Sequence, residues 1–212
     1  NAAQSKSFSQ RTGVDFDVDQ RRNPKQLIMN RSIPVLLLLF AAFVAQGQPL
    51  YVSKTNTTSF FAGTAVEDID ATNTKAVSLL NVNTGELSIS IPNKEFHFKR
   101  ALMEEHFNEN YMESGKYPKS EFKGKIKNPE QYNFASTTPF TVSVTGTLTI
   151  HGVAKERTME VTVVNQGGKI EGKATFTIAL SDHNIDRPKI LWEKLAETVN
   201  VTTTFTYEPY KK

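Results

Sequence analysis

Histidine, serine and carboxylate side chains are the groups that could do catalytic or metal chemistry here, because the 212-residue chain contains no cysteine. The four histidines are His97, His106, His151 and His183. None stands in the His-Glu-x-x-His or His-x-His spacing that places two ligands on one metal ion, and no Gly-x-Ser-x-Gly nucleophile motif is present. We therefore interpret the histidines as ordinary polar residues, and we expect no enzymatic activity, no metal site and no cofactor.

A glycine-containing segment resembles a phosphate-binding loop but lacks its essential parts. Residues 167–173 fit the pattern G-x-x-x-x-G-K, yet Ala174 stands where a magnesium-binding Ser or Thr is needed. The segment also continues into strand-like alternation, whereas a phosphate loop is followed by the N-terminus of a helix. We reject a nucleotide site at this position.

Aromatic residues form a more informative set. They are Phe96 and Phe98 in an extended segment, Phe107 and Tyr111 on a helical segment, and Phe122 and Phe176 on strands. Such residues either fill a core or line the interior of a small β-barrel, which at about eight strands can be packed solid or hold one small ligand. Small residues within the apolar faces, such as Gly172 and Ala174, favour the hollow interior.

The two-residue period of β-strands dominates the chain after residue 50. Between Phe140 and His151, apolar residues and one glycine alternate with Thr, Ser and His without a break. Similar segments lie at 51–53, 59–64, 77–82, 87–91, 122–126, 159–163, 170–180 and 199–207. Glycine-containing turns at 83–85, 151–152 and 167–168 predict antiparallel hairpins.

These segments predict an all-β fold, an antiparallel β-barrel of about eight strands. No helix recurs between strands, which argues against a parallel βαβ sheet. A closed barrel is favoured over a flat sandwich because closure removes the exposed edges of long Thr-rich strands. Alternation does not tell which face points outward. An outer-membrane barrel stays an alternative, although Lys123, Lys125 and Lys127 on successive outward positions speak against it.

Two segments break the strand period and predict short helices. In residues 100–113, Met103, Phe107 and Tyr111 recur at four-residue intervals, with Leu102 and His106 beside them. Residues 190–197 form a second candidate, which carries the only tryptophan, Trp192. We expect both helices to cap a mouth of the barrel.

The first 47 residues have the composition of a processing signal. Residues 29–47 combine a short basic start, a mostly apolar run and a small-x-small site at Ala45 and Gly47, which predicts a secretory signal peptide. Residues 1–28 are interpreted as disordered or as an over-extended gene start. Residues 48–212 then form the mature domain, periplasmic or secreted. Its 19 basic and 19 acidic residues cancel, which argues against nucleic acid as a partner.

Three ordered segments, at 105–114, 116–124 and 145–153, resemble the YceI-like family. The resemblance implies an extended lipocalin-like β-barrel that binds a polyisoprenoid or another long-chain lipid in the periplasm. The sequence departs from the family at Ala101, which follows Arg100 where many relatives have Asp, and at Asp186-Arg187-Pro188. A polar head group would meet His106, Arg100 or Arg187.

The predicted function is thus an exported protein that holds a long-chain amphiphile in an apolar lumen. The residues expected to bind it are Phe96, Phe98, Leu102, Met103, His106, Phe107, Tyr111, Phe122, Leu148, Phe176 and Trp192. The alternative is a non-catalytic structural or interaction domain with a filled core. No integral membrane span is expected after signal removal, and a homodimer is left open.

Overall fold

The structure is a computed structural model that describes residues 50–63, 68–186 and 197–210. The segments predicted to be a disordered start and a signal peptide lie outside these residues. So do Trp192 and the predicted helix at 190–197, apart from Glu197.

Ten strands make up most of the described residues. They are β1 (Leu50–Gly63), β2 (Asp68–Asn73), β3 (Val77–Asn81), β4 (Glu86–Pro92), β5 (His97–Phe98), β6 (Lys119–Ile126), β7 (Phe140–Ile150), β8 (Val153–Gln166), β9 (Lys169–Ala179) and β10 (Thr198–Pro209). The helical elements are η2 (Asn93–Glu95), α2 (Ala101–His106), η3 (Phe107–Tyr111), η4 (Pro129–Gln131) and η5 (Leu180–His183).

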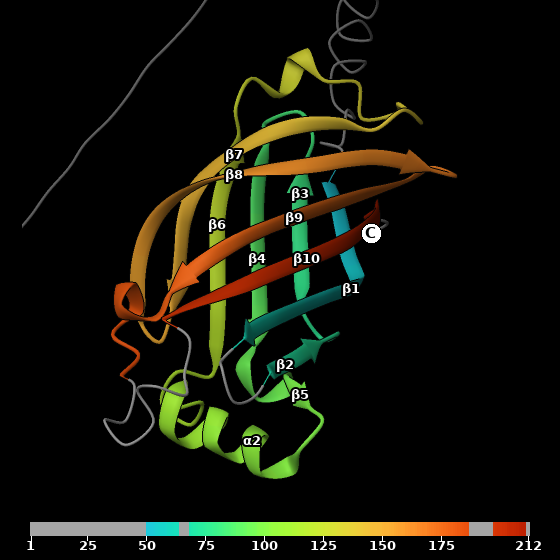
Figure 1. The fold of residues 1–212 in the computed structure, drawn as a ribbon. Coiled ribbons are helices and arrows are strands. Elements are labelled where there is room, and N and C mark those ends of the chain that lie inside the picture. The colour runs from blue at the N-terminus through green and yellow to red at the C-terminus, as the bar shows by residue number, and fades with distance from the viewer. Residues whose placement is uncertain (1–49, 64–67, 187–196, 211–212) are drawn as a thin grey trace, which may run out of the picture. The chain divides into compact units, whose positions relative to one another are not determined.

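Eight of the strands close into a barrel. Antiparallel pairing runs in the order β1, β3, β4, β6, β7, β8, β9 and β10, and β10 pairs with β1 to complete the circle (Figure 1). The short strands β2 and β5 extend the sheet beside the second half of β1. The prediction of an antiparallel barrel of about eight strands with a short helix is confirmed.

Strand β1 differs from the prediction. Residues 51–53 and 59–64 were expected to be separate strands, but one continuous strand carries both. A β-bulge between Val52 and Thr55 shifts the alternation, so that buried Ser53 is followed by buried Asn56 and Thr58. This bulge interrupts the two-residue period, so the sequence pattern predicts two strands where the structure has one.

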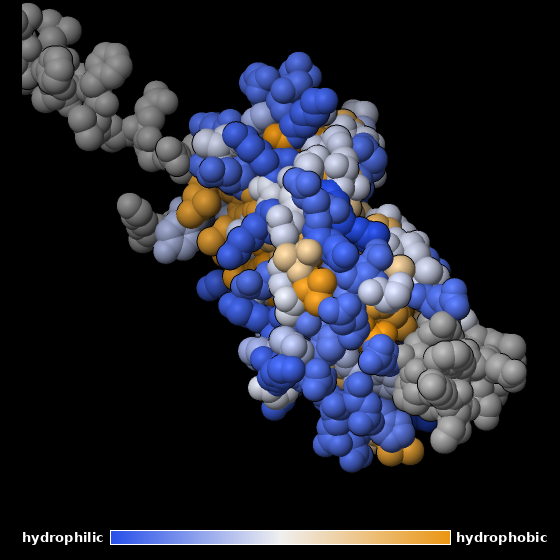
Figure 2. Space-filling model, turned by 90° about the vertical axis from the view of Figure 1, so that its left-hand side faces the viewer, coloured by the Kyte–Doolittle hydropathy of each residue, from blue (hydrophilic) through white to orange (hydrophobic). Residues whose placement is uncertain are grey.

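The apolar faces of the strands point into the barrel. On β7, Val142, Val144 and Leu148 are buried, whereas Thr141 and Thr145 are exposed. The face of the molecule shown in Figure 2 is accordingly mostly hydrophilic, with smaller hydrophobic areas. This settles the orientation that the sequence pattern left open.

The segment between β4 and β6 carries the helix that was predicted at 100–113. It consists of α2 and a π-helical turn, η3, and it lies at one end of the barrel (Figure 1). The fully buried side chain of Asn93 joins the start of this segment to the residues that follow it. Asn93 Nδ2 donates to Tyr117 O at 2.7 Å, and Ser120 Oγ donates to Asn93 Oδ1 at 2.9 Å.

Candidate functional site

The interior of the barrel is a cavity of about 200 Å³. Its walls are apolar side chains from β4, β6, β7, β8, β9 and β10, among them Ile89, Phe122, Val142, Ile170 and Phe205. For comparison, an engineered cavity of about 150 Å³ lined by Leu, Ile and Phe stays dry and binds benzene. The interior is therefore not filled by its own side chains, and it has the character of a hydrocarbon site.

The few polar side chains among the lining residues already have partners within the protein, including Asn93 for Ser120 and Lys119 for Glu121. Thr58 Oγ1 and Thr203 Oγ1 lie 2.9 Å apart. Ser78 Oγ donates to Ser88 O at 3.0 Å, which leaves the Tyr207 hydroxyl to donate to Ser78 Oγ at 2.7 Å. Burial raises the pKa of Tyr207 well above its ordinary value, so this phenol stays neutral. A ligand in the lumen would meet hydrocarbon.

Four phenylalanine rings pack together where the helical segment meets the barrel, and two of them, Phe60 and Phe96, line the cavity. Phe60 of β1, Phe96, Phe98 of β5 and Phe107 of η3 have ring centroids 5.1–5.7 Å apart in five pairs. Phe107 stacks on Phe60 at an interplanar angle of 25°. These rings, which we call the phenylalanine cluster, join the helical segment to the barrel wall. Phe60 was not among the predicted site residues, although it lies in a predicted strand.

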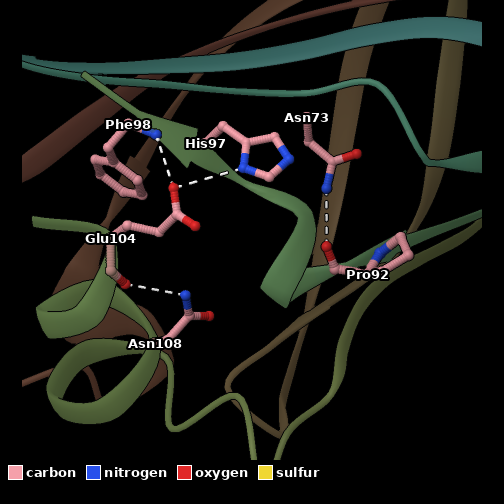
Figure 3. Close-up of polar contacts among 6 residues, drawn as sticks. All are labelled: Asn73, Pro92, His97, Phe98, Glu104 and Asn108. Atoms are coloured by element: carbon pink, nitrogen blue, oxygen red, sulfur yellow. Dashed lines mark hydrogen bonds and ion pairs between the residues drawn. The ribbon is translucent and has the colours of Figure 1, made fainter. Parts of the chain in front are cut away.

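A carboxylate adds a polar attachment for the same helix. Glu104 of α2 points toward β5, where Oε2 accepts the Phe98 backbone N–H at 3.2 Å and lies 3.5 Å from His97 Nδ1 (Figure 3). Asn108 Nδ2 donates to Glu104 O one helical turn away. Both ends of the Glu104 residue are therefore held, which fixes α2 against the barrel.

A second contact fixes the end of the helical segment to the turn between β7 and β8. His151 Nε2 lies 2.8 Å from Glu113 Oε2, and its Nδ1 lies 3.2 Å from His183 O. His151 and Gly152 have φ of 51° and 74°, the left-handed conformation that a tight hairpin turn requires. This turn links the helical segment to η5.

Another aromatic group lies in the segment between β6 and β7. Tyr132 stacks on Phe140 at 5.7 Å, and Phe134 packs edge-on against Phe140 at 5.9 Å. Phe134 also lines the cavity. The sequence analysis missed these residues because residues 127–139 follow neither strand nor helix periodicity.

The predicted site residues fall into three groups. Phe96, Phe122, Leu148 and Phe176 line the cavity. Phe98 and Phe107 belong to the phenylalanine cluster, Tyr111 packs against the core, and Met103 is half-buried. Leu102 is 61% exposed and His106 is exposed, so the structure places both on the solvent side of the helix and away from the cavity wall.

The glycines of the apolar faces have two different roles. Gly124 and Gly146 are paired across β6 and β7, and a Cβ on Gly146 would overlap Gly124 Cα and Lys123 O. These two glycines allow close approach of the strands. At Gly172 a Cβ would have only ordinary contacts, at 3.6 Å or more. Gly172 therefore leaves room in the cavity.

Within the described ranges, no three His, Asp or Glu side chains are grouped closely enough to hold a metal ion. The same part of the chain contains no helix with the length and hydropathy of a membrane span.

The fold and lumen define a closed antiparallel barrel with an apolar internal cavity. The sequence profile of the YceI-like domain matches residues 43–207. The chain therefore belongs to the YceI-like family, as the resemblance of its sequence segments had indicated.

Solved structures share this fold at low sequence identity. One is a polyisoprenoid binding domain from Saccharophagus degradans, with a TM-score of 0.67, 14% identity, and coverage of 77% of this chain and 99% of that chain. BcnA from Burkholderia cenocepacia gives a TM-score of 0.61 and 18% identity over 71% of this chain and 95% of that chain. No curated protein matches the chain.

Proposed function

We propose that this protein binds a polyisoprenoid or another long-chain amphiphile, with the chain of the ligand in the barrel lumen. The observation that carries the proposal is the cavity of about 200 Å³, whose wall is hydrocarbon and whose polar groups are satisfied internally. Two findings support this ligand class: the chain belongs to the YceI-like family, and a polyisoprenoid binding domain shares its fold. A filled-core structural domain would not leave such a space.

Hydrocarbon burial supplies the affinity. Each buried methylene contributes about 0.8 kcal/mol, so about a dozen buried carbons contribute about 10 kcal/mol. That gain offsets much or all of the association cost of about 4–15 kcal/mol. No catalytic step is part of the proposal. The signal-peptide pattern at residues 29–47 and the family membership support export to the periplasm or the cell exterior.

The test is mass spectrometry of organic extracts from protein purified from its native compartment. The wild type should carry a reproducible long-chain species. Gly172→Leu should carry much less, because its side chain takes the space of about four methylenes and weakens binding about 200-fold.

Thr175→Leu is the matched control for this experiment. It places the same leucine on the exposed face of the same strand, β9, and should retain lipid like the wild type. An empty extract from the wild-type protein would favour the structural-domain alternative.

A further inference from the structure

Strands β8 and β9 are paired along only part of their length. The register joins Val161–Gln166 of β8 to Lys169–Ala174 of β9. Residues 153–160 of β8 pair only with β7, and residues 175–179 of β9 pair only with β10. We call these two facing edges the seam. In Figure 1 the strands lie side by side near their hairpin and diverge toward η5.

The lumen reaches the seam. Met159 of β8, Phe176 of β9 and Leu180 of η5 line the cavity but are only half-buried. In the paired part of β9 the lumen-facing residues Ile170 and Ala174 are buried, and within the seam Ile178 is buried as well. Solvent therefore reaches the cavity wall at Met159 and Phe176, where the two strands no longer pair.

Two cationic side chains lie on the inward face of β8 at the seam. Directly opposed residues of an antiparallel pair share a face. Lys155 is opposite Leu148, whose side chain lines the cavity, and Arg157 is opposite Gly146. Arg157 thus continues the inward series of Met159 and the residues beyond it, and Gly146 has no side chain to occupy the space facing it.

Arg157 spans the seam and keeps donors free. Its Nη1 donates to Thr177 O on β9 at 2.7 Å. A guanidinium has five N–H donors, and among the described residues no carboxylate forms an ion pair with Arg157 or Lys155. Glu156 and Glu160 alternate with these cations and so lie on the opposite, outer face of β8. The inner side of the seam therefore presents unneutralised positive charge beside an apolar cavity.

We propose that the seam is an oxyanion site in which Arg157 and Lys155 hold the phosphate or carboxylate head group of the amphiphile. The inference rests on the proposed function, because the chain of the same molecule would occupy the lumen. A planar guanidinium and a nearby ammonium match the oxygen atoms of such a group. The ligand would then lie with its head between β8 and β9 and its chain directed inward past Met159 and Phe176.

Inward charges at an unpaired strand edge have another known role. They prevent the edge from pairing with another chain. In that case the two cations would protect the protein from aggregation without affecting which ligand is bound. A head-group site favours a charged ligand over a neutral one, whereas edge protection does not depend on the ligand. The test therefore compares a charged and a neutral ligand.

The test compares two probes with the same chain, geranylgeraniol and geranylgeranyl phosphate, on the delipidated full-length mature protein. Affinities are measured for the wild type, for the double variant Arg157→Gln/Lys155→Gln and for Arg157→Lys. The control, Lys125→Gln/Lys173→Gln, removes two exposed cations elsewhere on the barrel, one on β6 and one on β9. Inorganic phosphate is the third probe, used alone and as a competitor.

The proposal predicts that the seam double variant loses affinity for the phosphate ester by about tenfold or more. Its affinity for the alcohol should be unchanged, Arg157→Lys should retain most of the preference for the ester, and the control should behave as the wild type. Free phosphate should compete only weakly, since it lacks the chain.

Three results would overturn the inference. Equal affinities of wild type and double variant for the ester would leave edge protection as the role of the cations. Parallel losses for both probes would mean that the substitutions disturb the lumen. If free phosphate binds and the ester is not preferred over the alcohol, the seam is an anion site that does not hold the head group of the lipid. Failure of the wild type to bind either long-chain probe would instead refute the proposed function.

Discussion

His183 is a buried histidine that connects η5 to the barrel. Its side chain is 1% exposed, and Nδ1 lies 3.1 Å from Val153 O, so η5 is held against the start of β8. Burial lowers the pKa of His183, because the protonated form loses hydration, although the hydrogen bond to Val153 acts in the opposite direction. The folded protein thus favours neutral His183.

The consequence is a dependence of stability on pH. The unfolded chain binds a proton at His183 below about pH 6.5, while the folded protein resists it. The contribution of this group is therefore fully present above about pH 6.5 and is lost as the pH falls below it, at a rate of up to about 1.4 kcal/mol per pH unit. His183→Gln should flatten the fall in unfolding free energy between pH 7.5 and 5.5, measured by urea denaturation.

His106→Gln is the control for this measurement, because His106 is exposed on the helix. It should leave the pH dependence of the wild type intact. An undiminished slope in His183→Gln would show that the acid sensitivity comes from other groups.

The sequence predicts the role of a residue where the two-residue alternation of a strand alone decides which face its side chain is on. Phe122, Leu148 and Phe176 were assigned to the apolar faces of strands and do line the cavity. Arg157 shares the parity of Met159 and was within reach of the same reasoning. Its importance was not visible, because the sequence does not reveal where two strands stop pairing.

The helical segment is held by a small number of contacts. The phenylalanine cluster, the Glu104 contacts and the His151–Glu113 pair join it to the barrel. None of the α2 residues is buried, so the attachment depends on a few side chains. Elements of this kind open at lower free energy than the sheet that carries them.

Phe107→Asp should release this segment without unfolding the barrel. The substitution removes three ring contacts and places a charge among the remaining phenyl rings. Amide hydrogen exchange should become faster in residues 101–111 and stay unchanged in β7 to β10, and the lipid content of the purified protein should fall. Leu102→Asp, on the exposed side of the same helix, should change neither quantity. Lipid retained at the wild-type level would show that the helical segment does not close the lumen.

Most elements followed from periodicity, and the exceptions have local causes. Strands β7, β9 and β10 and the helix at 101–111 match their predicted positions, whereas β8 is longer than the predicted segment 159–163 at both ends. Strand β2, with the sequence Asp-Ile-Asp-Ala-Thr-Asn, is rich in residues of low strand propensity. The two-residue strand β5 is too short to show a period. Both exist because they extend the sheet beside β1.

At the scale of the whole molecule, the sheet is closed but its interior is not filled. The pairing of β1 with β10 removes free edges around most of the circle, yet the enclosed space is not filled. The sequence indicated closure through its long alternating strands. It did not determine the volume of the cavity, because that volume depends on side-chain directions, such as that of the Phe122 ring, which lies where a Cβ on Gly124 would be.

A hollow core gives up packing contacts that a ligand can restore, so stability should depend on lipid occupancy. A ligand present at about 100 times its dissociation constant stabilises the folded state by about 2.7 kcal/mol. For a domain of this size that corresponds to about 5–10 °C in Tm. Delipidation of the wild-type protein should lower Tm by this amount, and adding back geranylgeraniol should restore it, as measured by calorimetry. Gly172→Leu should show a much smaller difference between its two forms, since leucine occupies part of the space. A wild-type Tm that is independent of lipid would mean that the cavity is stable when empty and that its walls gain nothing from a bound chain.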